Sequence, residues 1–241
     1  FLYNRLQRKG SDSKDIHRLA ARDRHVFAAL MLAHGHGDGL VTGATRKSAH
    51  VLERLNHVFD ANAKHGAVGI TALLHKGRIV FIGDTLVHEW PNEEDLANIA
   101  EKGAKVARHM GLEPRVAFVS FSTFGYPVSE RAEKMQRAPD VLDARGVDFE
   151  YEGEMTVDVA LNAESQKNYP FSRLTGPANI LVVPARHSAS ISVKLMQEMA
   201  GATVIGPILT GLDKSIQICS TTSTANDILN MAILAACKVG E

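Results

Sequence analysis

A glycine, a hydroxyl and a cation follow an expected short β-strand at 40–41 and lead into an expected helix. They are Thr42, Gly43 and Arg46. Free backbone N–H groups at a helix start attract anions, glycine lets a ligand approach the backbone, and arginine binds phosphate through its forked donors. The segment is a candidate phosphate site. A plain strand-to-helix turn with a solvated arginine explains the same residues.

Two further segments also follow expected strands. Ser122 and Thr123 precede a glycine, a pattern typical of a phosphate or adenine cradle, with simple capping of the next helix as the alternative. Gly206-Pro207 predicts a rigid turn, which is weak evidence for a site by itself. Arg186 follows a strand and opens a helix, and is a further candidate for ligand binding.

The last helix is preceded by a run of hydroxyl residues that contains Ser220 and Thr221. Asp227 lies near the start of that helix. A carboxylate there could remove a proton from a thiol or hydroxyl. A capping box, with the acidic residue compensating the helix dipole, explains the pattern equally well.

The sequence gives no support for a metal site or a redox nucleotide site on this chain. His34, His36 and Asp38 are close together but lie among glycines at a helix end, without a firm third ligand or nearby side chains that would orient the histidines by hydrogen bonds. No G-x-G-x-x-G motif follows a strand, and no Walker A loop is present.

Helical and β-rich segments alternate along the chain, which predicts an α/β fold with a mainly parallel sheet. A hairpin around Lys76-Gly77 is expected to form an antiparallel edge of that sheet. Helical periodicity covers 13–35, 46–60, 93–110, 129–145, 156–166, 188–200 and 224–239, and strands are expected at 40–41, 68–75, 78–83, 115–121, 148–152, 179–183 and 202–205.

Composition narrows the classes of partner. Among 241 residues, Lys+Arg and Asp+Glu are both 27, so nothing indicates binding to nucleic acid or to an anionic membrane surface. No apolar run approaches the ~20 residues that span a bilayer. Two cysteines do not form a disulfide framework, and a cytoplasmic location fits best.

Taken in order, several of these segments resemble the phosphate acetyltransferase family. The series is Asp38-Gly39-Leu40-Val41-Thr42-Gly43, Ser120-Phe121-Ser122-Thr123, Glu152-Gly153-Glu154-Met155, Thr175-Gly176-Pro177-Ala178-Asn179, Gly206-Pro207-Ile208 and Ser220 with Asp227. The resemblance implies two α/β lobes, similar to isocitrate and isopropylmalate dehydrogenases, with a cleft between them. Lobe 1 would be 1–64 plus 211–241, with roughly 80 of its N-terminal residues missing, and lobe 2 would be 65–210.

The resemblance also implies a CoA thioester ligand and a departure from the family's chemistry. Family enzymes exchange an acetyl group between CoA and phosphate with a Ser-Arg pair and an Asp. Ser220 and Asp227 match that pattern, but Thr221 occupies the arginine position. Two further family arginines fall on Leu6 and Glu53, and a family lysine falls on Phe124.

Loss of these cations favours binding of acetyl-CoA over catalysis, because a charge-assisted phosphate contact contributes several kcal/mol to transition-state binding. A working phosphate acetyltransferase is the alternative, with Arg46, Arg54 or Arg186 supplying the cations. A purely structural oligomerisation module is a third reading.

A subset of the family is similar in further segments, namely 3–10, 22–27, 41–46, 78–81 and 84–88. That subset is the phosphotransacetylase-like C-terminal region of large bacterial NADP-dependent malic enzymes. The similarity implies an acetyl-CoA-responsive regulatory region that forms homo-oligomers. The sites for malate, NADP and Mg²⁺ or Mn²⁺ would lie upstream of this chain.

Overall fold

The structure, a computed structural model, describes residues 1–10, 12–59 and 66–239. The chain divides into two compact units, which consist of 1–67 with 208–239 and of 68–207. The lobe boundary expected at 64/65 lies outside the described residues. At the second crossing, the observed position, 207/208, lies within strand β7 (Thr203–Thr210), and the expected one, 210/211, lies at the end of this strand.

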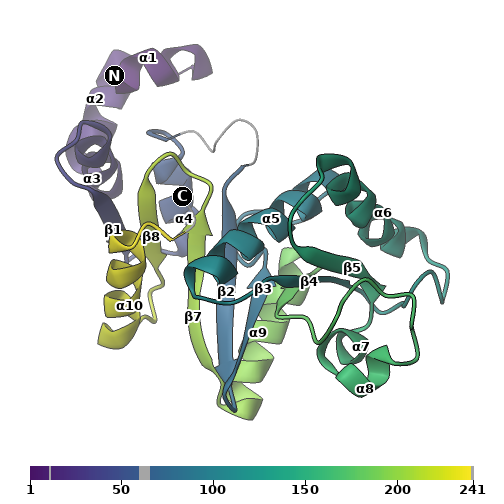
Figure 1. The fold of residues 1–241 in the computed structure, drawn as a ribbon. Coiled ribbons are helices and arrows are strands. Elements are labelled where there is room, and N and C mark those ends of the chain that lie inside the picture. The colour runs from purple at the N-terminus through teal and green to yellow at the C-terminus, as the bar shows by residue number, and fades with distance from the viewer. Residues whose placement is uncertain (11, 60–65, 240–241) are drawn as a thin grey trace. The chain divides into compact units, whose positions relative to one another are not determined.

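The first unit, which we call unit 1, contains the parallel strand pair β1 (Gly39–Gly43) and β8 (Ser215–Cys219). Helices α3, α4 and α10 pack against this pair, and α2 packs on α3 (Figure 1). The helices of unit 1 are α1 (Leu2–Leu6), a 3₁₀ turn (Gln7–Lys9), α2 (Ser13–Arg22), α3 (Arg24–Ala33), α4 (Ser48–Leu55) and α10 (Ala225–Ala236).

In unit 1, one expected helix was wrong and one strand was not predicted. The single helix expected at 13–35 is interrupted at Asp23, whose backbone is extended and whose carboxylate accepts the N–H groups of His25 and Val26 to start α3. Strand β8, a short Ser-Ile-Gln-Ile-Cys stretch with buried Gln217, was not expected. The Gln217 side chain is satisfied by the backbone of Leu209, from which it accepts at 2.9 Å and to which it donates at 3.1 Å.

The second unit, unit 2, is built on a six-stranded sheet in the order β5-β4-β6-β3-β2-β7. Neighbours β3–β6, β6–β4 and β4–β5 are parallel, which confirms the mainly parallel α/β fold. The hairpin of β2 and β3 is antiparallel as expected, but it is not at an edge, because β7 lies beyond β2. The strands are β2 (Val68–His75), β3 (Arg78–Gly83), β4 (Arg115–Val119), β5 (Glu150–Met155) and β6 (Ile180–Val182).

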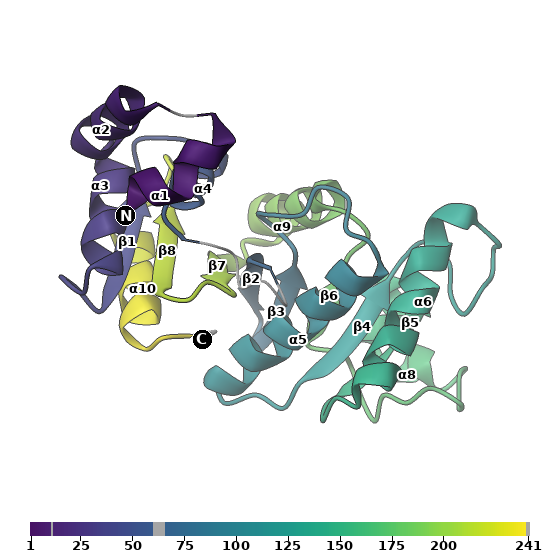
Figure 2. The ribbon, with the colours of Figure 1, turned by 90° about the horizontal axis from the view of Figure 1, so that it is seen from above.

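Helices cover both faces of this sheet. Helices α5 (Glu93–His109) and α6 (Glu130–Arg145) lie on one face, and α9 (Arg186–Ala200) lies on the other (Figures 1 and 2). The expected helix at 156–166 is split into α7 (Val157–Leu161) and α8 (Ala163–Gln166) by Asn162, whose side chain caps α8. The core on the α9 face includes Leu73, Val119, Met155, Leu181 and Ala189.

Candidate functional site

Two of the four candidate segments are brought together at the carboxyl ends of β1 and β8. The parallel register pairs Gly43 with Cys219, so Arg46 and Ser220 belong to loops that leave neighbouring strands at the same edge. The N–H of Ala44 donates to the carbonyl oxygen of Cys219 at 3.0 Å and joins the two loops. Open α/β sheets bind ligands at this kind of edge.

Gly43 is required here by the neighbouring strand. Its φ is +113°, and a Cβ atom at this position would lie 2.2 Å from the carbonyl oxygen of Cys219. Only glycine accommodates both the backbone conformation and this close approach. The structure therefore gives Gly43 a packing reason that is independent of a ligand.

Thr42 contacts a buried histidine that sequence reasoning did not single out. The Oγ1 of Thr42 lies 2.7 Å from Nδ1 of His25, which is 3% exposed. Burial lowers the pKa of His25 against the opposing effect of Asp23, so the ring is neutral at neutral pH. In the sequence His25 was one of several scattered histidines, and only the packing of α3 on β1 reveals its contact.

The hydroxyl-rich loop after β8 forms the capping box that the sequence offered as an alternative. The Oδ2 of Asp227 accepts from the N and Oγ1 of Thr224 at 2.7 and 2.9 Å, and Asp227 N donates back to Thr224 Oγ1 at 3.2 Å. Ser220 Oγ accepts the N–H of Thr222 at 3.1 Å. Burial, and secondarily the charge of Asp227, raise the pKa of the Cys219 thiol.

The cations near this edge are sparse. Thr221 is exposed and uncharged. Arg46 is exposed, and within the described ranges it makes no hydrogen bond or ion pair. Leu6 is buried, whereas Glu53 is exposed and lies 3.8 Å from His50. Arg46 is therefore the sequence-predicted cation that this edge presents to solvent, with exposed Lys47 next to it.

In unit 2, Ser122 and Thr123 hold the loop after β4 in place. Ser122 is fully buried, with Oγ 3.5 Å from Oγ of Ser120. Thr123 Oγ1 accepts the N–H of Thr156 at 3.1 Å. Gly206 and Pro207 do not form the expected turn, because both lie inside strand β7.

Arg186 is the first residue of α9 and is tied to the loop that follows β3. Its Nη1 donates to the carbonyl oxygen of Leu86 at 3.1 Å, and its Nη2 lies 3.6 Å from the carboxylate of Glu89. Part of its hydrogen-bonding capacity is thus used within the protein.

Asp84 organises that loop. Its carboxylate is 2% exposed and accepts the N–H groups of Gly69, Leu86, Val87 and His88, together with a contact of 2.8 Å from Nδ1 of His88. This hydrogen bond is the main cause of the raised pKa of His88, and burial opposes it. Asp84 therefore fixes the loop to which Arg186 is anchored.

A pocket of about 840 Å³ opens in unit 2 at the carboxyl ends of β4 and β6. We call it the Trp90 pocket. Trp90 is 70% exposed and Phe121 is 61% exposed, so the pocket presents aromatic surface to solvent. The lining of the Trp90 pocket comprises Trp90, Glu93, Ser120, Phe121, Glu133, Lys134, Arg137, Pro184, Ala185, His187 and Ser188.

Lys134 gives this pocket a positioned cation. Its Nζ donates to the carbonyl oxygens of Pro91 and Pro184 at 3.1 and 2.9 Å, and lies 5.8 Å from the centre of the Trp90 ring. Burial lowers the pKa of Lys134. An ammonium group has three donors, so one remains for a ligand. The pocket thus combines aromatic surface with a hydrogen-bond donor.

The described part of the chain holds no group of three or more His, Cys, Asp or Glu side chains arranged to bind a metal ion. Nor does any of its helices have the length and apolar composition needed to cross a membrane.

Comparison with known proteins extends the resemblance along the chain. Residues 1–236 match the family described as phosphate acetyl/butaryl transferase. The chain is 51% identical to an NADP-dependent malic enzyme of Rhizobium meliloti (strain 1021), over 100% of this chain and 32% of that relative. It is 28% identical to a phosphate acetyltransferase of Bacillus subtilis (strain 168), over 96% of this chain and 72% of the relative.

Solved structures agree with the sequence relatives. A phosphotransacetylase from Streptococcus pyogenes superposes with a TM-score of 0.90 at 26% identity, covering 99% of this chain and 74% of that chain. The chain therefore spans 32% of the malic enzyme relative, and 72% and 74% of these two transferases. On the strength of the match over residues 1–236 and of this structural similarity, the chain belongs to the phosphate acetyl/butaryl transferase family.

Proposed function

We propose that this chain is a regulatory acetyl-CoA-binding and oligomerising region of an NADP-dependent malic enzyme. The observation that carries the proposal is the turn after β8, where neutral Thr221 occupies the position at which the resemblance expects an arginine. A hydroxyl cannot replace the charge-assisted contacts that stabilise a reacting phosphate. Malate oxidation with NADP and Mg²⁺ or Mn²⁺ would then take place elsewhere in the longer protein.

The Trp90 pocket supports a CoA-type ligand. Its volume, about 840 Å³, lies in the range of small-molecule sites. An adenine ring stacks well on an exposed indole, and the remaining donor of Lys134 suits a phosphate oxygen. Such a ligand regulates an enzyme only if it binds one arrangement of the protein more tightly than another.

We expect acetyl-CoA to bind the purified chain without being turned over. Calorimetric titration should give a saturable heat, and the melting temperature should rise with ligand concentration, because a ligand that binds only the folded state stabilises it. A thiol-release assay with acetyl-CoA and phosphate should remain at background. A turnover of about 1–1000 s⁻¹, usual for enzymes, would contradict the regulatory proposal.

A matched pair of variants tests where the ligand binds. Trp90→Ala should weaken acetyl-CoA binding by roughly tenfold or more, in line with a lost stacking contact of at least 1–2 kcal/mol. Phe27→Ala removes an aromatic side chain that is 54% exposed on α3, far from the lining residues in sequence, and should leave binding unchanged. Absence of heat and of thermal shift for the wild type would contradict acetyl-CoA binding and favour a structural module.

An active phosphate acetyltransferase is the second candidate. It is favoured by exposed Arg46, which lies at the same strand edge as Ser220 and has no partner in the described ranges. If thiol release does occur, Asp227→Asn and Arg46→Gln should each abolish most of it.

Helix α9 carries the surface best suited to an oligomer contact. Ile191, Leu195 and Met199 are spaced by four residues on its outer face and are 66%, 58% and 80% exposed. Lys194 and Glu198 flank this stripe. In an antiparallel pairing of two copies about a two-fold axis near Met196, each Lys194 faces the other copy's Glu198. The apolar stripe and this charge complementarity favour a second copy of the chain as the occupant.

We expect Leu195→Asp to weaken self-association by at least about 30-fold. Association would bury an unpaired carboxylate at the centre of the interface, where single residues contribute most to binding. Sedimentation equilibrium on the wild type and the variant measures the effect. Phe27→Asp adds the same charge on an exposed residue of α3 and serves as the control. A wild type that is monomeric throughout, or a Leu195→Asp protein that associates like the control, would rule out this interface.

A further inference from the structure

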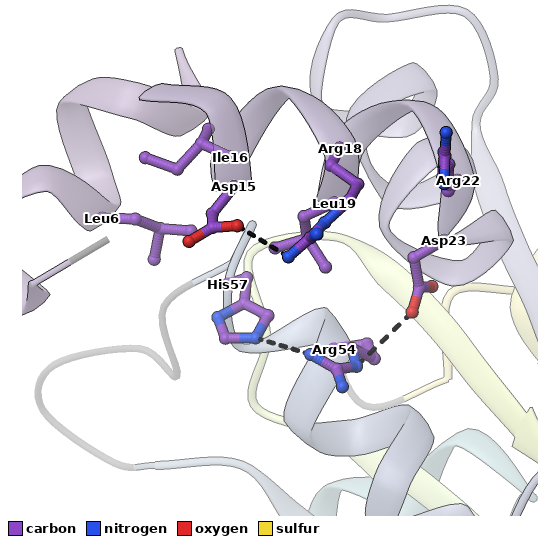
Figure 3. A pocket seen from close by; sticks show the side chains of 9 residues that line it. All are labelled: Leu6, Asp15, Ile16, Arg18, Leu19, Arg22, Asp23, Arg54 and His57. Carbon is purple, nitrogen blue, oxygen red and sulfur yellow. Dashed lines mark hydrogen bonds and ion pairs between the residues drawn. The ribbon is translucent and has the colours of Figure 1, made fainter. Parts of the chain in front are cut away.

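We propose that a second pocket, in unit 1, is a binding site for a phosphate group. It lies between α1, α2 and α4 and has a volume of about 520 Å³ (Figure 3). We call it the Arg54 pocket. It is lined by Leu6, Asp15, Ile16, Arg18, Leu19, Arg22, Asp23, Arg54 and His57. Of these residues, the sequence had suggested only Arg54 as a possible substitute cation, and Leu6 as a position where the family has an arginine.

Two arginines and a histidine surround the same space. Figure 3 shows the guanidinium groups of Arg18, from α2, and Arg54, from α4, facing the pocket, with the ring of His57 beside them. Arg22 stands apart, farther along α2. Arginines from two different helices thus converge where a tetrahedral anion could accept hydrogen bonds from both.

The hydrogen bonding of Arg54 is incomplete. Its side chain is 26% exposed, and its buried Nε, 3.4 Å from Oδ2 of Asp23, makes no hydrogen bond. Its Nη1 makes one long contact, 3.4 Å to Nε2 of His57. A guanidinium group has five donors, and a partly buried charge with poor acceptors gains strongly from an anionic oxygen. Arg54 is therefore the central residue of the proposed site.

The balance of charge also favours an anion. Asp15 is paired with Arg18 at 2.6 Å, and Oδ1 of Asp23 already accepts two backbone N–H groups of α3. Burial and the neighbouring charge of Arg54 lower the pKa of His57, so its ring is neutral at neutral pH. Three arginines and two aspartates leave the lining with one net positive charge, which a phosphate would neutralise.

The apolar part of the lining limits the ligand further. Leu6, Ile16 and Leu19 form one wall, so the site suits a phosphate attached to an uncharged body as well as free phosphate. The two sources share the same recognition chemistry. One source would be a phosphate of a CoA molecule, a possibility that rests on the proposed function, and the other is a small free anion.

Inorganic phosphate is the first probe, measured by calorimetry and thermal shift at constant ionic strength. We expect saturable binding to the wild type and at least a tenfold loss of affinity in Arg54→Gln. Arg8→Gln removes the same charge from an exposed residue outside the pocket and should bind like the wild type. Equal binding by Arg54→Gln and Arg8→Gln, or no saturation in the wild type, would overturn the proposal.

Arg54 also lies close to Asp23, so a second variant guards against loss of folding. Arg18→Gln alters an ion pair whose side chains are 66% and 57% exposed, and it should fold normally while still losing at least threefold in phosphate affinity. An Arg18→Gln protein with wild-type affinity would remove Arg18 from the site and contradict the two-arginine geometry.

A third measurement, the affinity for acetyl-CoA, distinguishes a CoA phosphate from a free anion. It also separates the phosphate-site proposal from the proposed function. If acetyl-CoA affinity falls in Arg54→Gln together with phosphate affinity, the pocket holds a phosphate of the CoA ligand. If only phosphate affinity falls, the pocket binds a free anion. If the wild type binds phosphate but not acetyl-CoA, the proposed function fails while the phosphate site stands.

Discussion

Asp84→Asn should lower the free energy of unfolding of unit 2 by about 3–5 kcal/mol, because buried donors around the side chain lose a charged acceptor. The carboxylate accepts four backbone N–H groups and contacts Nδ1 of His88. The side-chain NH₂ group of asparagine would face some of these N–H groups, and two donors cannot form a hydrogen bond with each other. Trp90, the single tryptophan, follows this loop, so its fluorescence during urea unfolding reports the change.

The loss of stability caused by Asp84→Asn should become smaller as the pH rises. Because Asp84 raises the folded-state pKa of His88, the stabilisation from this pair is fully present below the unfolded-state pKa of histidine and is lost as pH rises through the folded-state pKa. The difference in the free energy of unfolding between the wild type and Asp84→Asn should therefore narrow above that pH. The pKa of His88, measured by NMR, should fall in the variant.

The matched control is Asp140→Asn, which removes a carboxylate from an exposed position of α6 and should leave the midpoint of urea unfolding unchanged. An Asp84→Asn protein as stable as Asp140→Asn would show that the loop does not depend on the carboxylate.

Gly43→Ala should destabilise unit 1 by about 3 kcal/mol or more. A side chain at φ +113° costs about 1–3 kcal/mol in backbone strain, and the new Cβ would meet the carbonyl oxygen of Cys219 at 2.2 Å. The β1–β8 pairing would have to shift. Labelling of the buried Cys219 thiol by a thiol reagent measures how often this pairing opens, and its rate should rise about 100-fold.

Gly35→Ala provides the control in the same unit. Its φ is also positive, at +79°, but a Cβ there would meet no atom within 4 Å. This variant should lose only the strain of the left-handed conformation, about 1 kcal/mol. Exposed Cys237 should be labelled rapidly in every variant. Equal labelling of Cys219 in the two glycine variants would show that contact with β8 does not restrict residue 43.

Much of the architecture followed from local patterns. Alternating strands and helices predicted the α/β fold and the mainly parallel sheet, and the order of short motifs identified the family. The capping residues before α10 were also readable, since a Thr–Asp pair three residues apart has a local geometric meaning. These features depend on residues close together in the sequence, whose preferences hold in most tertiary contexts.

Local patterns failed where distant segments meet. The break at Asp23 looked like helix interior, because the apolar spacing of 13–35 continues across it, yet its carboxylate starts a new helix. Strand β8 was missed, and its buried Gln217 is satisfied by the backbone of Leu209, which lies eight residues earlier in the chain. The hairpin was expected at an edge, because the sequence does not say where β7 pairs.

The sequence alone shows that Thr221 stands where the family has an arginine. The proposal that the chain binds CoA without transferring acetyl follows from this substitution. Only the tertiary structure decided that Gly43 is held against Cys219, that Thr42 meets His25, and that Arg18 and Arg54 share a pocket. The physical reason is that strand register and helix packing bring together residues tens of positions apart, and no local propensity encodes that pairing.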